Sequence, residues 1–159
     1  MPDRPQAGSG DYPGSTRNGT RRVLVVDDEH TIRMLCRVNL RASGMEVLEA
    51  DDGKAGLELA RREQPDLILL DVMMPGLDGW SVARELAADK RTKDIPIVFI
   101  TARADPADRR LGEQLGGVGY VVKPFDPVGI AELVEDVLTR IERGEREQLQ
   151  RGIATEHEE

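Results

Sequence analysis

Five short apolar runs recur along the middle of the chain, separated by segments with helical spacing. They occupy residues 23–26, 46–50, 67–70, 97–100 and 118–122. Four runs are almost continuously apolar and rich in branched side chains, which is typical of strands buried on both faces of a parallel sheet. The second run alternates with glutamates and is expected at a sheet edge.

The segments between the runs place apolar side chains at helical intervals. In residues 30–43, one broad apolar face is formed by Ile32, Leu35, Cys36, Val38 and Ala42. In residues 128–141, a second apolar face is formed by Ile130, Leu133, Val134, Val137 and Ile141. Aspartate followed by proline, at 105–106 and 126–127, predicts two helix starts, and Gly44 and Gly116 stand where helices should end. This alternation predicts an α/β fold of the (βα)5 type, a doubly wound five-stranded parallel sheet with helices on both faces.

The two ends of the chain differ from this middle. Residues 1–20 are rich in small and polar residues and predict a disordered leader, because they cannot bury enough apolar surface to offset ordering entropy. Residues 142–159 are mostly charged or polar and predict a solvated tail, as a helical extension of the last helix. The folded domain is therefore expected over residues 21–141.

Composition narrows the class of protein. The chain has 159 residues, a formal net charge of -8 and no apolar run near the ~20 residues of a membrane span. A nucleic-acid binder usually shows a basic excess, which is absent from this sequence. The single cysteine, Cys36, leaves no internal disulfide, and with the missing signal sequence it favours the cytoplasm.

Polar residues end four of the five runs. Asp27, Asp28 and Glu29 follow the first run, Asp71 the third, Thr101 the fourth and Lys123 the fifth. Turn chemistry explains one such residue well, but it explains four together poorly. Ligands of open α/β sheets bind beyond the carboxyl ends of strands, so a sheet ordered 2-1-3-4-5 would bring these four ends to one crevice.

The residue types at these ends suit phosphoryl transfer. Crowded carboxylates repel one another unless a cation neutralises them, and hard oxygen ligands in small number suit Mg²⁺. A carboxylate can also act as a nucleophile that forms an aspartyl phosphate. Lys123 could pair with phosphoryl oxygens and Thr101 could donate a hydrogen bond to them.

Four motifs in chain order resemble the receiver domain of bacterial two-component response regulators. They are Val-Leu-Val-Val-Asp-Asp-Glu at 23–29, Asp-Val-Met-Met-Pro-Gly-Leu-Asp-Gly at 71–79, Ile-Thr-Ala at 100–102 and Tyr-Val-Val-Lys-Pro-Phe at 120–125. The resemblance covers residues 22–141. It implies a flavodoxin-like fold with strand order 2-1-3-4-5, and a signalling switch that catalyses only its own phosphorylation and dephosphorylation rather than a turnover enzyme.

The resemblance also implies roles for the matched residues. Asp71 would be the phosphoacceptor and a ligand of Mg²⁺, which Asp28 would bind directly, Asp27 mostly through water and Met73 through its backbone carbonyl. Lys123, followed by a cis peptide bond, would pair with the phosphoryl group. Thr101 and Tyr120 match the family's switch pair, in which the hydroxyl moves toward the phosphoryl group and the ring turns into the vacated space.

The same resemblance implies partners. A sensor histidine kinase or a histidine phosphotransfer protein would supply the phosphoryl group, and an unidentified downstream protein would bind the surface of helix 4, strand 5 and helix 5. A phosphorylation-dependent homodimer is a further expectation, with no nucleic acid or membrane bound. Arg33, Arg37 and Arg41 form an outward basic stripe on the first helix, with Met34 and Leu40 also off the core face. This stripe is interpreted as a solvated face, with kinase docking as the alternative.

Three other functions remain to be weighed against a stand-alone receiver. The chain could be the receiver fragment of a DNA-binding transcriptional regulator, although the 18 residues after the last helix are too few for an effector and the Glu-rich end argues against it. It could be a Mg²⁺-dependent phosphatase similar to the haloacid dehalogenases, but Met73 stands where that family has a second aspartate. A flavodoxin-like FMN carrier fits poorly, because aromatic residues make up only 3% of the chain.

Overall fold

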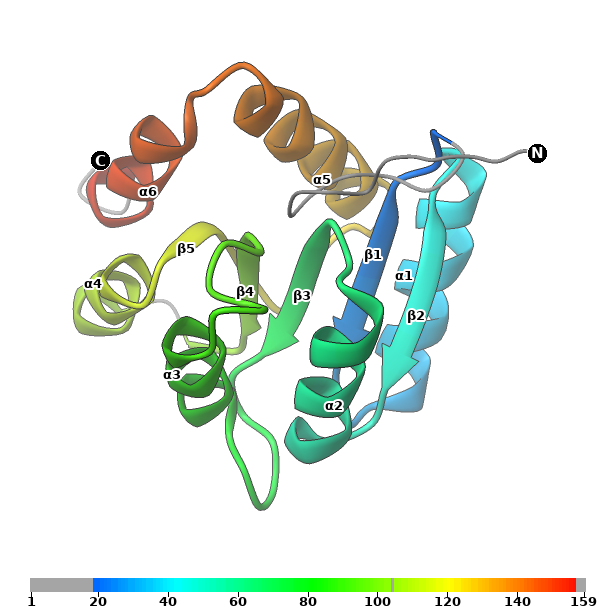
Figure 1. Cartoon of the computed structure of the whole chain (residues 1–159), viewed down its shortest axis with the longest axis horizontal. Coiled ribbons are helices and arrows are strands. Elements are labelled where there is room, and N and C mark those ends of the chain that lie inside the picture. The colour runs from blue at the N-terminus through cyan, green and yellow to red at the C-terminus, as the bar shows by residue number, and fades with distance from the viewer. Residues whose placement is uncertain (1–18, 104, 157–159) are drawn as a thin grey trace.

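The computed structural model describes residues 19–103 and 105–156, in which strands and helices alternate along the chain (Figure 1). The strands are β1 (Arg22–Val26), β2 (Glu46–Ala50), β3 (Leu67–Asp71), β4 (Ile97–Thr101) and β5 (Gly117–Val122). The helices are α1 (His30–Ala42), α2 (Gly53–Glu63), α3 (Gly79–Ala88), α4 (Pro106–Gln114), α5 (Pro127–Glu142) and α6 (Arg146–Glu156). All five predicted strands are confirmed. Apart from its last two residues, the predicted leader lies outside the described part of the chain.

The five strands form one parallel sheet in the order β2-β1-β3-β4-β5, as expected, with the glutamate-containing β2 at one edge. The register pairs Val26 with Leu70 and Asp71 with Ile100. Because parallel strands in register end at the same edge, the residues that follow β1, β3, β4 and β5 emerge side by side. The fold thus places the polar strand ends in one row.

The sheet is buried on both faces, which explains the continuous apolar runs. One face carries a core cluster that includes Leu24, Ile68 and Phe99 and is covered by α2 and α3, with α4 beside them. The other face carries Val25 and Leu69 under α1 and α5, which pack against each other. Alternate residues of each strand therefore serve opposite layers, so neither layer tolerates a polar residue before the strand ends.

The predicted apolar face of α1 is partly wrong. Cys36 and Leu40 are fully buried, whereas Val38 is 56% exposed. Apolar residues stand on several sides of this helix, Met34 among them, so their spacing alone does not fix which side faces the sheet. The sequence pattern consequently assigned Val38 to the core and placed Leu40 outside it.

The predicted helix ends are confirmed at four places. The Asp105 carboxylate accepts the backbone N–H of Asp108, and the Asp126 carboxylate accepts that of Val128, each with proline in the first turn. Gly44 and Gly116 have positive φ angles of 88° and 87°, the left-handed conformation that ends a helix at little cost for glycine.

The charged tail forms a helix of its own rather than an extension of α5. Gly144, at φ 82°, ends α5, and the backbone N–H of Glu145 then donates to the carbonyl of Arg140. An ion pair of 2.9 Å between the side chains of Arg140 and Glu145 holds this turn. The chain reverses, and α6 packs against α4 and β5 (Figure 1).

Candidate functional site

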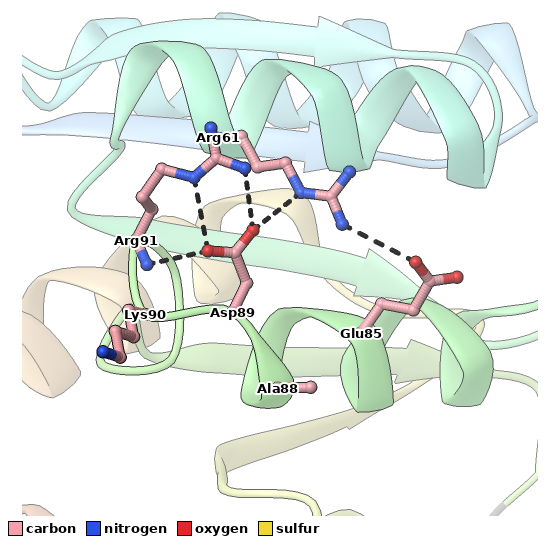
Figure 2. A pocket seen from close by; sticks show the side chains of 6 residues that line it. All are labelled: Arg61, Glu85, Ala88, Asp89, Lys90 and Arg91. Atoms are coloured by element: carbon pink, nitrogen blue, oxygen red, sulfur yellow. Dashed lines mark hydrogen bonds and ion pairs between the residues drawn. The ribbon is translucent and has the colours of Figure 1, made fainter.

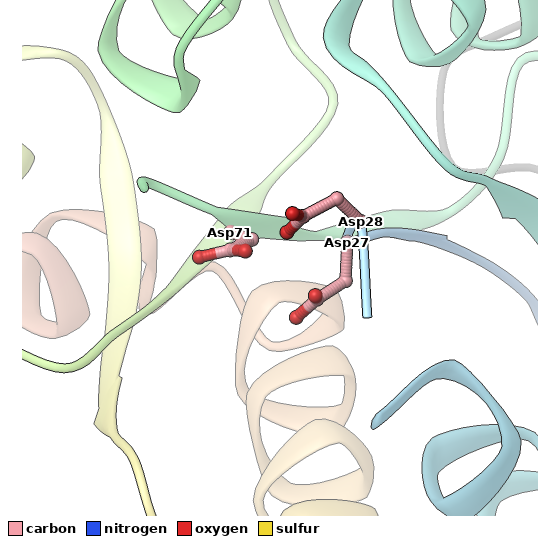
Figure 3. A group of neighbouring side chains, drawn as sticks. All are labelled: Asp27, Asp28 and Asp71. Carbon is pink, nitrogen blue, oxygen red and sulfur yellow. The ribbon is translucent and has the colours of Figure 1, made fainter. Parts of the chain in front are cut away.

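Three aspartates meet at the carboxyl edge of the sheet (Figure 3). Asp27 follows β1 directly and Asp71 is the last residue of β3, and both are essentially buried, at 0% and 1% exposure. Asp28 is exposed beside them. Carboxylate oxygens of the three residues lie within 4.8 Å of one another, close enough to ligate one ion. The predicted convergence of β1 and β3 is therefore present in the fold.

Lys123 brings the positive charge to this cluster from the end of β5. Its Nζ lies 3.1 Å from Asp27 Oδ2, 3.5 Å from Asp71 Oδ2 and 2.7 Å from Glu29 Oε1. The peptide bond that follows it, to Pro124, is cis as expected. Glu29 was noted in the sequence only as a third acid after the strand. Its position there was the signal that it could reach the same ammonium.

The charges in this cluster do not balance. Burial, together with the neighbouring Asp27 charge, raises the pKa of Asp71 to about 7, although Lys123 and the backbone N–H of Met73 act in the opposite direction. Burial alone would lower the pKa of Lys123, but its hydrogen bond to Glu29 and the Asp27 charge raise that pKa above its usual value. Three carboxyl groups thus share one ammonium, with the Asp28 carboxylate beside them, and a further cation would stabilise the group.

The donor set fits Mg²⁺. The buried Oδ2 of Asp27 is paired with the Lys123 ammonium but accepts no well-aligned hydrogen bond from the described residues, and it lies among oxygen ligands of the hard type that Mg²⁺ prefers. The backbone N–H of Met73 donates to Asp71 Oδ1 at 3.1 Å, so the Met73 backbone lies beside the cluster. His30 is exposed at the start of α1, as the sequence suggested.

Thr101 and Tyr120 meet at Arg103 rather than at the aspartates. The buried Thr101 Oγ1 accepts the backbone N–H of Arg103 at 3.1 Å, and the Tyr120 hydroxyl donates to the Arg103 carbonyl at 2.9 Å. The Tyr120 ring is already buried here, 8% exposed, and burial raises the pKa of its hydroxyl to about 12. The Arg103 side chain in turn pairs with Asp108 of α4 at 3.0 Å. Sequence reasoning missed this bridging role.

The predicted outward basic stripe on α1 is wrong for two of its three arginines. Arg33 and Arg37 fold onto Glu49 of β2, with N–O distances of 3.3 and 2.6 Å. Arg33 also donates to the backbone carbonyl of Asp27 at 2.7 Å. The single glutamate of the edge strand thus pairs with both arginines, and of the three arginines only Arg41 is exposed.

A second polar hollow lies where α3 ends (Figure 2). Its centre is Asp89, which binds the guanidinium groups of Arg61 and Arg91, each at 3.0 Å. Hydrogen bonds, first of all from Arg91, lower the pKa of Asp89 to about 2. This carboxylate is therefore already matched by cations, unlike the aspartates at the carboxyl edge.

Among the described residues, no helix is both long and apolar enough to cross a membrane.

Known proteins are similar to this chain in sequence. The chain is 44% identical over 122 residues to the "Probable transcriptional regulator ycf27" of Cyanophora paradoxa, which covers 77% of this chain and 50% of that protein. It is 43% identical over 122 residues to the "Alkaline phosphatase synthesis transcriptional regulatory protein PhoP" of Bacillus subtilis (strain 168), again covering 77% and 50%. The chain thus spans about half the length of the curated relatives it matches.

Solved structures with a similar fold include receiver domains of signalling proteins. The chemotaxis protein CheY4 of Vibrio cholerae superposes with a TM-score of 0.71 at 31% identity, covering 75% of this chain and 99% of that one. The receiver domain of the Francisella response regulator 1452 also gives 0.71, at 29% identity, covering 77% and 99%. Residues 23–135 match the family described as "Response regulator receiver domain". The chain therefore belongs to the response regulator receiver domain family.

Proposed function

We propose that Asp71 is the phosphoacceptor of this receiver domain and that it takes its phosphoryl group from a phosphohistidine. An Asp71 carboxylate oxygen forms a bond to phosphorus as the bond between phosphorus and the donor nitrogen breaks, and the departing imidazole takes up a proton from solvent. The donor would be a sensor histidine kinase or a histidine phosphotransfer protein. The observation that carries the proposal is the meeting of Asp71 with Asp27, Asp28 and Lys123 at one sheet edge.

The surrounding residues have separate tasks in this scheme. Asp27, Asp28, Asp71 and the Met73 carbonyl would hold Mg²⁺, which supplies positive charge to the phosphoryl oxygens. Lys123, 3.5 Å from Asp71, would pair with an oxygen of the transferred group, since an ammonium is a mobile point charge. Asp71 is only 1% exposed, and the backbone N–H of Met73 holds its Oδ1 in place at 3.1 Å.

The output of the site would pass through Thr101, Arg103 and Tyr120. If the Thr101 hydroxyl moves to the phosphoryl group, its bond to the Arg103 N–H lengthens, and the loop that holds Tyr120 and the start of α4 is released. A small charge change would then shift the population of two arrangements of the α4, β5 and α5 surface. An unidentified downstream protein, or a second copy of the chain, would recognise that change.

A second candidate function is that of the receiver part of a DNA-binding transcriptional regulator. Its support is that the relatives ycf27, PhoP and RpaA are named as transcriptional regulators, and that the match covers about half of the length of each. In that case the described residues would still supply only the phosphorylation switch. Direct binding of nucleic acid by these residues is not expected, and we place the domain in the cytoplasm with its kinase.

Intact-mass spectrometry after incubation with Mg²⁺ and a small phosphodonor tests the proposal. The wild type should gain one labile phosphoryl group, and Asp71→Asn, which keeps the shape of the side chain, should gain none. Chelation of the metal should abolish labelling of the wild type. Equal labelling of wild type and Asp71→Asn would exclude Asp71 as the acceptor.

A further inference from the structure

Helix α6 covers the outer side of β5, next to α4 (Figure 1). β5 is an edge strand of the sheet, with only β4 beside it. The α4, β5 and α5 surface is also the one through which the proposed switch would act. The chain therefore carries, in its own tail, a segment that lies on the surface through which the proposed switch would act.

Specific contacts of the first two turns hold α6 in this place. The Arg146 guanidinium donates to the backbone carbonyl of Asp94 at 2.7 Å, and the Gln150 side-chain amide donates to that of Gly116 at 3.3 Å. Leu149 packs against the core cluster of the α5 face. These contacts connect α6 to the segments that lead into β4 and into β5. Movement of either segment would change the fit of α6.

Helix α4 connects α6 to the switch residues. The Arg109 guanidinium lies 4.7 Å from the centre of the Tyr120 ring, and a Cβ placed on Gly112 would meet Phe99 at 3.3 Å and Tyr120 at 3.5 Å. The last two residues of α4, Glu113 and Gln114, line a polar groove together with Glu147, Gln150 and Arg151 of α6. The same helix thus contacts Tyr120 on one side and α6 on the other.

We infer that α6 is an intramolecular occupant of the α4–β5 surface and that phosphorylation of Asp71 loosens it. The inference rests on the proposed function. α6 fits the arrangement in which the Thr101 hydroxyl is bound to Arg103. A shift of that loop and of α4 weakens the packing of α6, so phosphorylation moves the equilibrium between docked and undocked α6 toward the undocked form. For a partner that needs this surface, the apparent affinity equals the intrinsic affinity multiplied by the fraction of molecules in which α6 is undocked.

Passive protection of an edge strand is the alternative explanation, since helices often cover such edges. The two explanations differ in their response to phosphorylation. A passive cover stays docked in both states. An isolated helix of the 11 residues of α6 is marginal in water, so this helix owes its order to its contacts and responds when they change.

Hydrogen exchange of the full chain, read by mass spectrometry, separates them. In Mg²⁺ with a small phosphodonor, the amides of residues 146–152 should exchange about 5-fold faster or more than in Mg²⁺ alone, a factor typical of coupled sites. Asp71→Asn should show no such change under the same conditions. If the intact mass shows the phosphoryl group and these amides are unchanged or slower, the inference is wrong while the proposed function stands. If no phosphoryl group is found, both fail.

Coupling is reciprocal, which gives a second test. Arg146→Ala removes the contact to Asp94, and we expect the equilibrium affinity for beryllofluoride, a phosphoryl mimic, to rise by about 5-fold. Arg143→Ala, an exposed arginine at the end of α5, is the matched control and should leave that affinity unchanged. An Arg146→Ala protein whose α6 exchanges faster but whose affinity is unchanged or lower would overturn the inference.

Discussion

At the amino-terminal end of the sheet, the buried Asp66 accepts the backbone N–H of Arg22 at 2.8 Å, whereas at the carboxyl end Asp71 is buried beside another carboxylate. Burial raises the pKa of Asp66 to about 6, and burial together with Asp27 raises that of Asp71 to about 7. The partner of Asp66 is fixed in a strand. The charge that faces Asp71 is a lysine shared with two other acids.

The two ends therefore serve different purposes. At the amino end, the Arg22 guanidinium donates to the carbonyl and carboxylate of Glu63, at 2.8 and 2.7 Å, and ties β1 to the end of α2. Asp66 Oδ1 accepts no hydrogen bond from the described residues, but the charges of Arg22 and Arg21 act on this carboxylate. At the carboxyl end, two buried aspartates and one exposed one lack sufficient cations. Under the proposed function, this excess negative charge would favour binding of Mg²⁺ and, through the ion, of a phosphoryl group.

The largest expected effect follows removal of the shared ammonium. Lys123→Ala should lower the metal-free free energy of unfolding by about 3 kcal/mol at pH 8, because truncating one partner leaves buried carboxylates uncompensated. Saturating Mg²⁺ should recover part of that loss, and metal binding should persist. Urea unfolding with and without Mg²⁺ measures both, with Lys54→Ala, an exposed lysine of α2, as the control. A Lys123→Ala protein as stable as the control would contradict the charge account.

Metal binding itself should give the next largest effect. Mg²⁺ at about 100 times its dissociation constant should stabilise the wild type by about 2.7 kcal/mol. Asp28→Asn should remove most of this gain while leaving the metal-free stability within about 0.5 kcal/mol, since Asp28 is exposed. Asp66→Asn should bind Mg²⁺ as the wild type does. Thermal unfolding against Mg²⁺ concentration provides the test, and equal gains in Asp28→Asn and wild type would count against the proposed ligand set.

The pH dependence of metal-free stability is spread over several pH units and separates the two ends. Both aspartates have raised pKa values, so between about pH 7 and pH 4 the folded state binds more protons than the unfolded chain. Stability should accordingly rise as the pH falls through this window, by up to about 1.4 kcal/mol per pH unit for each proton taken up. The stability gained in this way is lost as the pH rises through the same window, and well above pH 7 both aspartates are ionised in the folded and the unfolded chain, so their contribution no longer changes.

Substitution of each aspartate shows which part of the pH dependence it causes. Asp71→Asn should flatten the curve near pH 6 to 7, and Asp66→Asn should flatten its lower part. Asp89, whose pKa is lowered to about 2, acts only below the window. Urea midpoints collected in chelator across the range provide the measurement. Identical slopes in all three proteins would show that neither aspartate titrates as described.

The sequence predicted the strands and the acidic site well because both depend on strong local constraints. A strand covered on both faces must be apolar throughout, so its end is marked by the first charged residue, as at Asp27 and Asp71. The prediction was weaker where tertiary contacts decide. The rotation of α1 that buries Leu40 and exposes Val38 depends on what the helix packs against.

Long-range polar contacts were also beyond the sequence. The pairing of Glu29 with Lys123 spans 94 positions, and the pairing of Arg37 with Glu49 requires knowledge of where β2 lies. α6 has few apolar residues, so its charged composition resembles a solvated tail. Gly144 was the local signal that α5 ends there, and Leu149 was the signal that the following helix returns to the core.

Trapping the acyl phosphate by borohydride reduction tests the central claim most directly. Reduction of an aspartyl phosphate replaces the carboxyl group by an alcohol, and peptide mass spectrometry after labelling with Mg²⁺ and a small phosphodonor locates the converted residue. We predict conversion to homoserine at Asp71 and at neither Asp27 nor Asp28. Conversion at another aspartate, with Asp71 unmodified, would contradict the assignment of Asp71 as the residue that the buried acids and Lys123 serve.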